Sequence, residues 1–121
     1  MNIEQLHEYC ISKKGASEEF PFDKVTLVFK VMGKIFAIIS LEKWENGERK
    51  INLKCDPEWS EESRANYDSI SPGYHMNKKH WNTITVNADV TDVLLCELID
   101  HSYDIVVQKL TKKLKQELKS L

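Results

Sequence analysis

Two neighbouring apolar segments constrain the fold of this chain more than any other feature. Residues 26–31 and 35–41 are rich in β-branched and aromatic side chains, and only Met32, Gly33 and Lys34 separate them. Two such segments joined by a short link that contains glycine are typical of a tight β-hairpin. Because the second segment is apolar almost without interruption, we expect its strand to lie in the middle of a sheet.

Two further segments predict additional strands. After a predicted turn at residues 46–47, apolar and polar residues alternate over residues 50–55, which is the pattern of a strand with one buried and one solvated face. The polar positions of this strand are Lys50, Asn52 and Lys54, so its solvated face is basic. Over residues 80–86 we expect a fourth strand whose Ile84 and Val86 face the core.

Helical patterns and capping residues lie on either side of these strands. Residues 2–14 form an amphipathic pattern, and Gly15 follows where a left-handed cap often ends a helix. Asp56 is a favourable N-cap, and Pro57 suits the first position of a helix that we expect to end near Tyr67.

The end of the chain predicts two successive helices. The helical pattern begins at Asp89 or Thr91, and Ser102 is predicted to be the N-cap of the second helix. The second helix carries one apolar stripe, made up of Tyr103, Val106, Val107, Leu110, Leu114 and Leu118.

Before the fourth strand, Pro72 and Gly73 are typical of a type II turn in which the glycine takes a positive φ.

These elements predict a single α+β domain over residues 1–121. We expect a two-layer sandwich, in which an antiparallel sheet of about four strands has helices packed on one face. The length of 121 residues is enough to bury a hydrophobic core without metal or disulfide support. The sequence shows no internal repeat and no linker.

The charge and the cysteines limit the environment and the partners of the chain. Cys10, Cys55 and Cys96 are far apart and odd in number, which favours reduced thiols in the cytoplasm. The first residues lack the pattern of a secretion signal, and no segment is apolar enough for a membrane span, so we expect a soluble, unprocessed protein with no membrane partner. With a net charge of −2, any binding to phosphate must come from a local surface.

One segment departs from this acidic balance. The chain has 19 acidic against 17 basic residues, yet no acidic residue occurs from Ser69 to Ala88. Within this segment, residues 71–82 combine two lysines, two histidines and two aromatic side chains. The local electrostatic field should therefore be positive, which favours a binding surface.

Several motifs appear in an order that resembles the MmcQ/YjbR family. They are Phe-Pro-Phe-Asp at residues 20–23, the apolar hairpin at residues 28–37, the Pro-Gly-Tyr-His-Met-Asn-Lys-Lys-His-Trp-Asn block at residues 72–82, and Ser102-Tyr103. The third of these motifs is the most specific. The resemblance implies a fold like that of CyaY, the bacterial frataxin, and a role in DNA binding through a double-wing arrangement of sheet and loops.

On this basis we expect a nucleic-acid-binding surface built from basic and aromatic residues. Lysines would neutralise phosphates, and Trp81 or Tyr74 would stack on or wedge against a base. The candidate residues are Lys34, Lys50, Lys54, Tyr74, His75, Asn77, Lys78, Lys79, His80 and Trp81. In the alternative interpretation, Tyr74, Met76 and Trp81 pack a loop against the sheet and the lysines are merely solvated, as we also expect for the basic residues 109–119.

Metal and enzyme chemistry have little support. A frataxin-like fold would allow iron binding by carboxylates such as Glu4, Glu8, Glu18, Glu19 and Asp23, although the resemblance transfers no metal ligand. The cysteines and histidines lack zinc-site spacing, and no phosphate-binding glycine loop is present. Cys55 precedes a predicted helix, but its strand pattern points it into the core, away from any substrate. We expect neither catalysis nor a cofactor.

The leading hypothesis is a non-enzymatic protein that binds DNA weakly or without sequence preference. No recognition helix with clustered Arg, Asn or Gln is evident that would read bases. The alternative is an adaptor that binds a protein partner or small ligand on the same surface, with Tyr74 and Trp81 as anchors and the lysines as a polar rim.

Overall fold

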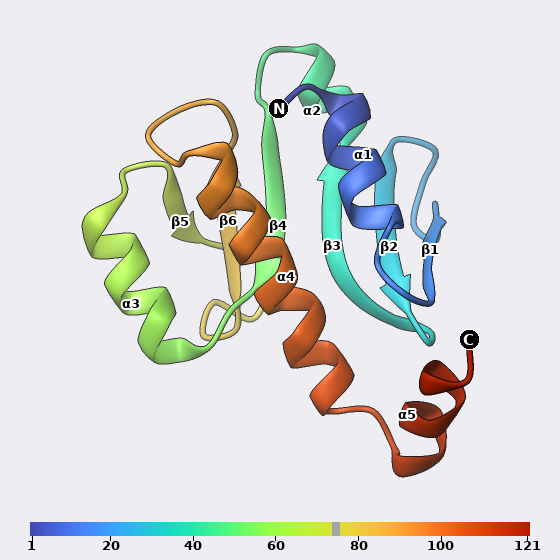
Figure 1. Ribbon diagram of the computed structural model, residues 1–121. Coiled ribbons are helices and arrows are strands. Elements are labelled where there is room, and N and C mark those ends of the chain that lie inside the picture. The colour runs from blue at the N-terminus through green and yellow to red at the C-terminus, as the bar shows by residue number, and fades with distance from the viewer. Residues whose placement is uncertain (74–75) are drawn as a thin grey trace.

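The computed structural model describes residues 1–73 and 76–121 (Figure 1). The elements in these ranges are α1 (Ile3–Ile11), β1 (Ala16–Glu19), β2 (Thr26–Val31), β3 (Lys34–Ser40), α2 (Leu41–Glu45), β4 (Lys50–Lys54), α3 (Pro57–Asn66), β5 (Ile70–Pro72), β6 (Trp81–Thr85), α4 (Asp92–Gln108) and α5 (Lys112–Lys119). The predicted α+β class is confirmed.

The described strands form one six-stranded antiparallel sheet in the order β1-β2-β3-β4-β6-β5. The predicted hairpin joins β2 to β3, and positive φ values at Met32 and Gly33 close its turn. The prediction of about four strands was too low, because β1 and β5 were missed. Both are short edge strands, and the sequences Ala-Ser-Glu-Glu and Ile-Ser-Pro carry no apolar alternation.

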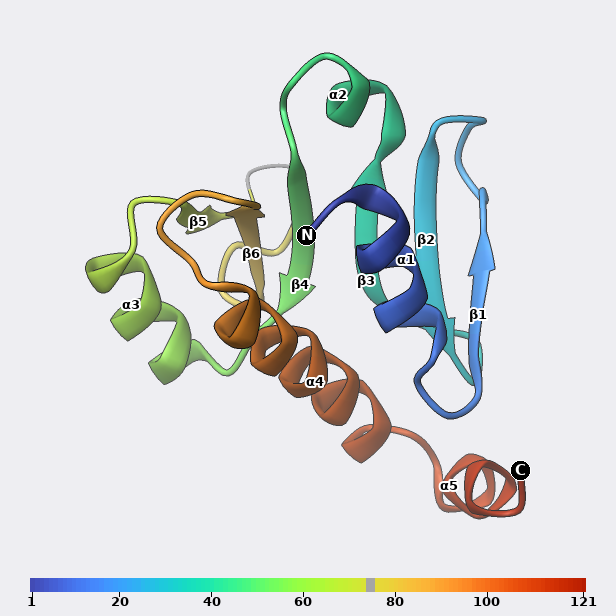
Figure 2. The same ribbon diagram turned by 45° about the horizontal axis from the view of Figure 1, so that its top comes forward.

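One face of the sheet is covered by helices. Figures 1 and 2 show α1 and α4 in front of the sheet and no described helix behind it. The core between these layers includes Phe29 and Phe36 from the central hairpin and Ile99 from α4, all with no exposed surface. The predicted inward residues Ile84 and Val86 also belong to this core. We call the opposite face the open face; it presents Lys50, Asn52 and Lys54 of β4 and Trp81, Thr83 and Thr85 of β6.

The two C-terminal helices exist, but the predicted boundary between them is wrong. α4 runs without a break through Ser102, which is fully buried. The Ser102 hydroxyl donates to the backbone carbonyl of Phe36 at 2.6 Å and accepts from the backbone N–H of Lys54 at 2.9 Å. The second helix begins instead at its N-cap Thr111. Ser102 therefore fixes α4 to strands β3 and β4.

The helix-boundary predictions succeeded where capping was local. α3 has the predicted N-cap Asp56 and ends before Tyr67. α1 is shorter than the predicted residues 2–14, although Gly15 does have a positive φ, of 70°. The chain also turns into α2 at Leu41, a residue that was predicted to end the second strand, because Ser40 accepts from the Lys43 N–H as an N-cap.

The turn predicted at Pro72 and Gly73 is not formed. Pro72 ends strand β5, and Gly73 does not have the positive φ that a type II turn requires. Glycine is needed there for space instead, since a Cβ at Gly73 would lie 3.1 Å from the Cβ of Trp81. The N–H of Gly73 donates to the carbonyl of Trp81 at 3.0 Å. Gly73 thus allows the chain to pass close to the start of β6.

Candidate functional site

Two of the predicted contact residues meet on the open face. Lys54 of β4 and Trp81 of β6 are directly paired across the sheet, so both side chains project to the same side. The Nζ atom of Lys54 lies 5.4 Å from the centroid of the Trp81 ring. This distance is within the range of a cation–π contact, which holds the ammonium group over the aromatic face.

Lys54 is also the centre of a cluster of positive charges. Burial lowers the pKa of Lys54, and the neighbouring ammonium groups of Lys109 and Lys34 lower it further. Lys34 begins β3 and Lys109 is the C-cap of α4, so three separate elements bring these charges together. None of the ion pairs formed within the described part of the chain includes any of the three. We call Lys34, Lys54, Lys109 and the adjoining Trp81 the lysine cluster.

The turn that precedes β6 is built by Asn77. The carbonyl oxygen of Asn77 accepts from the N–H groups of His80 and Trp81, and its side-chain Oδ1 accepts from the N–H of Lys79 at 3.0 Å. These bonds give Asn77 a structural role. The side chain of Lys79 is exposed. His80 is half-buried, and its carbonyl accepts from Cys55 N–H at 2.9 Å.

Arg64 fixes this turn to α3, a role that sequence reasoning missed. Its guanidinium donates to the carbonyl of Lys78 at 2.6 Å and to Oδ1 of Asn82 at 2.7 Å. Asn82 is 1% exposed, and its amide group also donates to Ser60 on α3. The pattern of strand and helix in the sequence could not reveal a bond between residues 18 positions apart. The turn is thereby held in one position relative to the lysine cluster.

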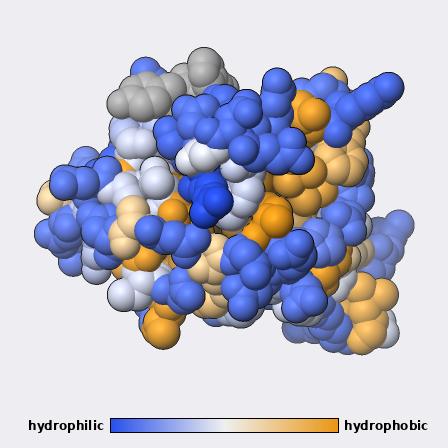
Figure 3. All heavy atoms as spheres, turned by 90° about the horizontal axis from the view of Figure 1, so that it is seen from above, coloured by the Kyte–Doolittle hydropathy of each residue, from blue (hydrophilic) through white to orange (hydrophobic). Residues whose placement is uncertain are grey.

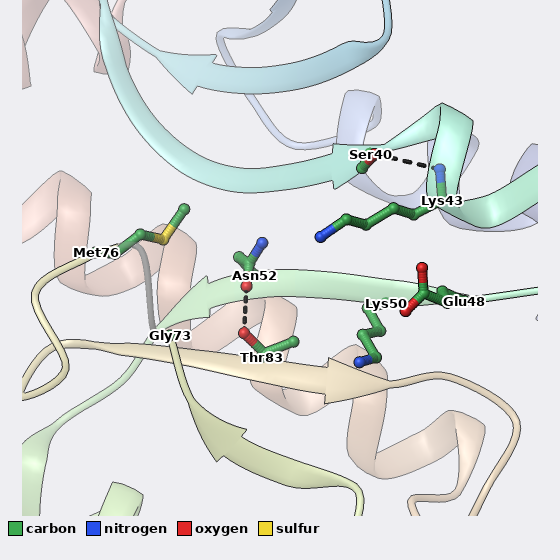
Figure 4. Close-up of a pocket in the computed structure, with 8 residues that line it drawn as sticks. All are labelled: Ser40, Lys43, Glu48, Lys50, Asn52, Gly73, Met76 and Thr83. Carbon is green, nitrogen blue, oxygen red and sulfur yellow. Dashed lines mark hydrogen bonds between the residues drawn. The ribbon is translucent and has the colours of Figure 1, made fainter.

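The structure separates the predicted residues into distinct places. Lys34, Lys54 and Trp81 lie in the lysine cluster, whereas Lys50 lies at the other end of β4 and lines a cavity with Lys43 (Figure 4). The exposed Lys78 and Lys79 lie on the turn. Tyr74 and His75 lie outside the described residues. Lys109, predicted to be part of a solvated helix face, is exposed and is also a member of the lysine cluster.

The carboxylates considered as iron ligands do not form a metal site within the described ranges. Glu18 is held by His7 at 2.8 Å, Glu19 pairs with Lys30 at 3.2 Å, and Asp23 accepts from its own loop. Those loop hydrogen bonds lower the pKa of Asp23. Among the described residues, no group of three or more His, Cys, Asp or Glu side chains could hold a metal ion.

Two of the three cysteines, Cys10 and Cys55, are buried thiols. Burial raises the pKa of the Cys55 thiol, and burial raises the pKa of Cys10 to about 12. A buried thiol with a raised pKa is a poor nucleophile near neutral pH.

Among the described residues, no helix has the length and apolar character needed to cross a membrane.

Comparison with known proteins places the chain in a family. The profile of the YjbR family matches residues 11–105, and the chain belongs to this family, as its sequence motifs indicated. It is 38% identical over 120 residues to YbdF of Escherichia coli O157:H7, with 93% of each chain covered. It is 30% identical over 121 residues to YjbR of Escherichia coli strain K12, with 100% of each covered.

Two solved structures share the fold. The crystal structure of a Deinococcus radiodurans protein has a TM-score of 0.87 at 39% identity, over 98% of this chain and 88% of that one. A crystal structure of a Pseudomonas syringae protein has a TM-score of 0.70 at 31% identity, over 87% of this chain and 98% of that one. The arrangement of sheet and helices is therefore common to these chains.

Proposed function

We propose that this protein is a cytoplasmic, non-enzymatic nucleic-acid-binding protein that contacts the phosphate backbone with the lysine cluster at the Lys54 end of β4. The observation that carries this proposal is the lysine cluster, in which Lys34 and Lys109 lower the pKa of Lys54 beside Trp81. A CyaY-like, double-wing arrangement, as implied by the family resemblance, is part of the same proposal.

The electrostatics of the cluster support an anionic partner. Cations that repel one another in the free protein gain interaction energy when a phosphate is placed among them. Each phosphate that is neutralised also releases counterions, which makes the affinity strongly dependent on salt. The Trp81 ring adds a surface on which a base can stack, particularly in a single strand. The exposed Lys78 and Lys79 extend the positive surface along the neighbouring turn.

The test is fluorescence anisotropy with labelled duplex and single-stranded DNA of random sequence at about 50 and 200 mM salt, where multi-phosphate binding differs strongly. Lys34→Glu/Lys54→Glu should weaken binding and flatten the salt slope by about 2, at roughly 0.9 per phosphate contact. The control variant Lys112→Glu/Lys113→Glu makes the same charge change on exposed residues of α5. Equal affinity of the two variants would refute the assignment to the lysine cluster.

A second candidate function, docking of a protein partner, is favoured by a different surface. Phe20 is 47% and Phe22 67% exposed, whereas the predicted anchor Trp81 is half-buried. Seen from above, the surface is mostly hydrophilic, with apolar side chains in several separate patches (Figure 3). Three hydrogen bonds to Asp23 hold the loop after Phe22 in place, which lowers the entropy lost on binding.

The partner hypothesis is tested by affinity capture from cells that make the protein. A partner retained by the unaltered protein and lost with Phe20→Ala/Phe22→Ala would support it. A partner lost with Lys34→Glu/Lys54→Glu instead would indicate docking at the lysine cluster.

A further inference from the structure

A cavity lies on the open face at the opposite end of β4 from the lysine cluster. Its volume is about 180 Å³, and Figure 4 shows its lining residues: Ser40, Lys43, Glu48, Lys50, Asn52, Gly73, Met76 and Thr83. The floor comes from β3, β4 and β6, and one wall comes from α2 and the residue Glu48 beyond it. Such a volume holds several water molecules or a small organic molecule.

Hydrogen-bond donors converge on one end of this cavity. The Oδ1 atom of Asn52 accepts from the Thr83 hydroxyl at 2.5 Å, which leaves the Asn52 NH₂ group directed away from Thr83. The Lys43 side chain extends across the cavity toward Asn52 (Figure 4). The hydroxyl oxygen of Ser40 accepts from the N–H of Lys43, so its own hydrogen remains to be donated. The ammonium of Lys43 and the amide of Asn52 thus offer protons to one region, and the hydroxyl of Ser40 lines the same cavity.

The charges in the cavity are not neutralised by ion pairs. None of the ion pairs formed by the described residues includes Lys43, Lys50 or Glu48. The Glu48 carboxylate lies between the side chains of the two lysines in Figure 4. The site therefore combines a donor-rich end, suited to an oxyanion, with one carboxylate that accepts hydrogen bonds.

We propose that this cavity binds a small organic phosphate that carries hydroxyl groups, such as a sugar phosphate. The phosphate is held by Lys43, Asn52 and Ser40, because charge-assisted hydrogen bonds to phosphate oxygens are among the stronger ones in proteins. Glu48 accepts from the hydroxyl groups of the ligand, and Lys50 adds positive charge from the floor of the cavity. Carbon atoms of the ligand contact the Met76 side chain.

This site differs from the surface proposed to bind nucleic acid. Lys43 and Glu48 are not members of the lysine cluster, and the mixed charge at the cavity suits a small hydroxylated ligand better than a continuous phosphate backbone. A phosphate at the end of a nucleic-acid strand has the same chemistry, so the experiment must separate the two sources.

The experiment is isothermal titration calorimetry at fixed ionic strength with three probes: ribose 5-phosphate, ribose and inorganic phosphate. We expect ribose 5-phosphate to bind more tightly than inorganic phosphate, and ribose to bind more weakly than either. Lys43→Gln should weaken ribose 5-phosphate at least tenfold, since a charged hydrogen bond to phosphate is lost. Glu48→Gln should remove most of the advantage of ribose 5-phosphate over inorganic phosphate.

Two controls make the result decisive. Lys112→Gln removes an exposed lysine of α5 and should leave ribose 5-phosphate binding unchanged. Lys34→Glu/Lys54→Glu, which tests the proposed function, should weaken DNA binding and keep ribose 5-phosphate binding within about threefold.

The proposal is overturned by failure of ribose 5-phosphate to bind, or by equal binding to the Lys43→Gln variant. A labelled oligonucleotide with a 5′-phosphate identifies the other source: if it binds through Lys43 and ribose 5-phosphate does not, the cavity belongs to the nucleic-acid surface. If the unaltered protein binds ribose 5-phosphate but does not bind DNA, the proposed function fails and the proposal for this cavity stands.

Discussion

Polar side chains on the two faces of the sheet differ in the partners that they have within the protein. On the helix-covered face, Ser102, Asn82 and Arg64 are joined to backbone or side-chain partners by short hydrogen bonds. On the open face, Lys50 and Lys54 form no ion pair within the described residues. The buried polar groups on the covered face therefore hold the fold together, whereas the ammonium groups of these two lysines on the open face are available to a ligand. This contrast predicts that mutations on the covered face lower stability, whereas mutations on the open face change ligand binding.

The largest effect on stability is expected from Ser102→Ala. The substitution removes the acceptor of the Lys54 N–H and the donor to the Phe36 carbonyl in a site with no exposed surface. Because buried groups are left unpaired, we expect a loss of about 2–3 kcal/mol in the free energy of unfolding. Urea denaturation measures it. Ser120→Ala, at the exposed C-cap of α5, should change stability by less than about 0.5 kcal/mol. Equal losses for the two serines would contradict the contrast.

A smaller loss is expected from Gly73→Ala. The new Cβ would lie 3.1 Å from the Cβ of Trp81, so the chain must move by a few tenths of an ångström at the start of β6. We expect a cost of about 1–2 kcal/mol, as for other overpacked sites. At Gly33 a Cβ would meet nothing within 4 Å, but its φ is +81°. Gly33→Asn should therefore cost less than Gly33→Ala, whereas Gly73→Asn should cost more than Gly73→Ala. Thermal unfolding of the four variants tests whether space limits substitution at Gly73 and whether the positive φ limits it at Gly33.

Much of the sheet was predictable because its signals are local. The apolar hairpin of β2 and β3 and the alternation in β4 specify strand, turn and facing without reference to distant residues. The edge strand β1 was not predictable, since two glutamates and a serine become a strand only through pairing with β2. Serine is a favoured N-cap residue, so the sequence alone suggested that Ser102 begins a helix. Only the packing of α4 on β3 and β4 shows why Ser102 lies inside a helix.

The candidate site was predictable only in part, for the same reason. The alternation in β4 placed Lys50 and Lys54 on a solvated face, and the structure agrees. Lys109 and Lys43 lie 55 and 11 residues from Lys54, in helices whose exposed lysines have no periodic signal of function. Their roles follow from tertiary contacts alone. The same holds for Arg64, which reaches the turn before β6 from α3.

On the open face, Lys54→Gln should leave stability almost unchanged. The side chain is crowded by Lys34 and Lys109, and its charge is disfavoured in the folded protein. We therefore expect a change within about 0.5 kcal/mol, with stabilisation as the favoured direction, as for exposed charge changes generally. Urea denaturation at neutral pH measures it. The same variant should weaken DNA binding, and a large loss of stability would place Lys54 among the structural residues instead.

The smallest and most specific effect concerns the pKa of Lys54. Burial is its largest cause of lowering, and the charges of Lys109 and Lys34 follow. Lys109→Gln removes one repelling cation and should raise the pKa of Lys54 toward its ordinary value, whereas Lys112→Gln should not change it. The measurement is NMR titration of the lysine side-chain Cε resonances. Because its pKa is lowered, Lys54 loses its proton before ordinary lysines do as pH rises. The contribution of Lys54 to phosphate binding should therefore fade at a lower pH in the unaltered protein than in Lys109→Gln. An unchanged Lys54 pKa in Lys109→Gln would mean that the charge at the C-terminus of α4 does not act on Lys54, and the lysine cluster would then consist of strand residues alone.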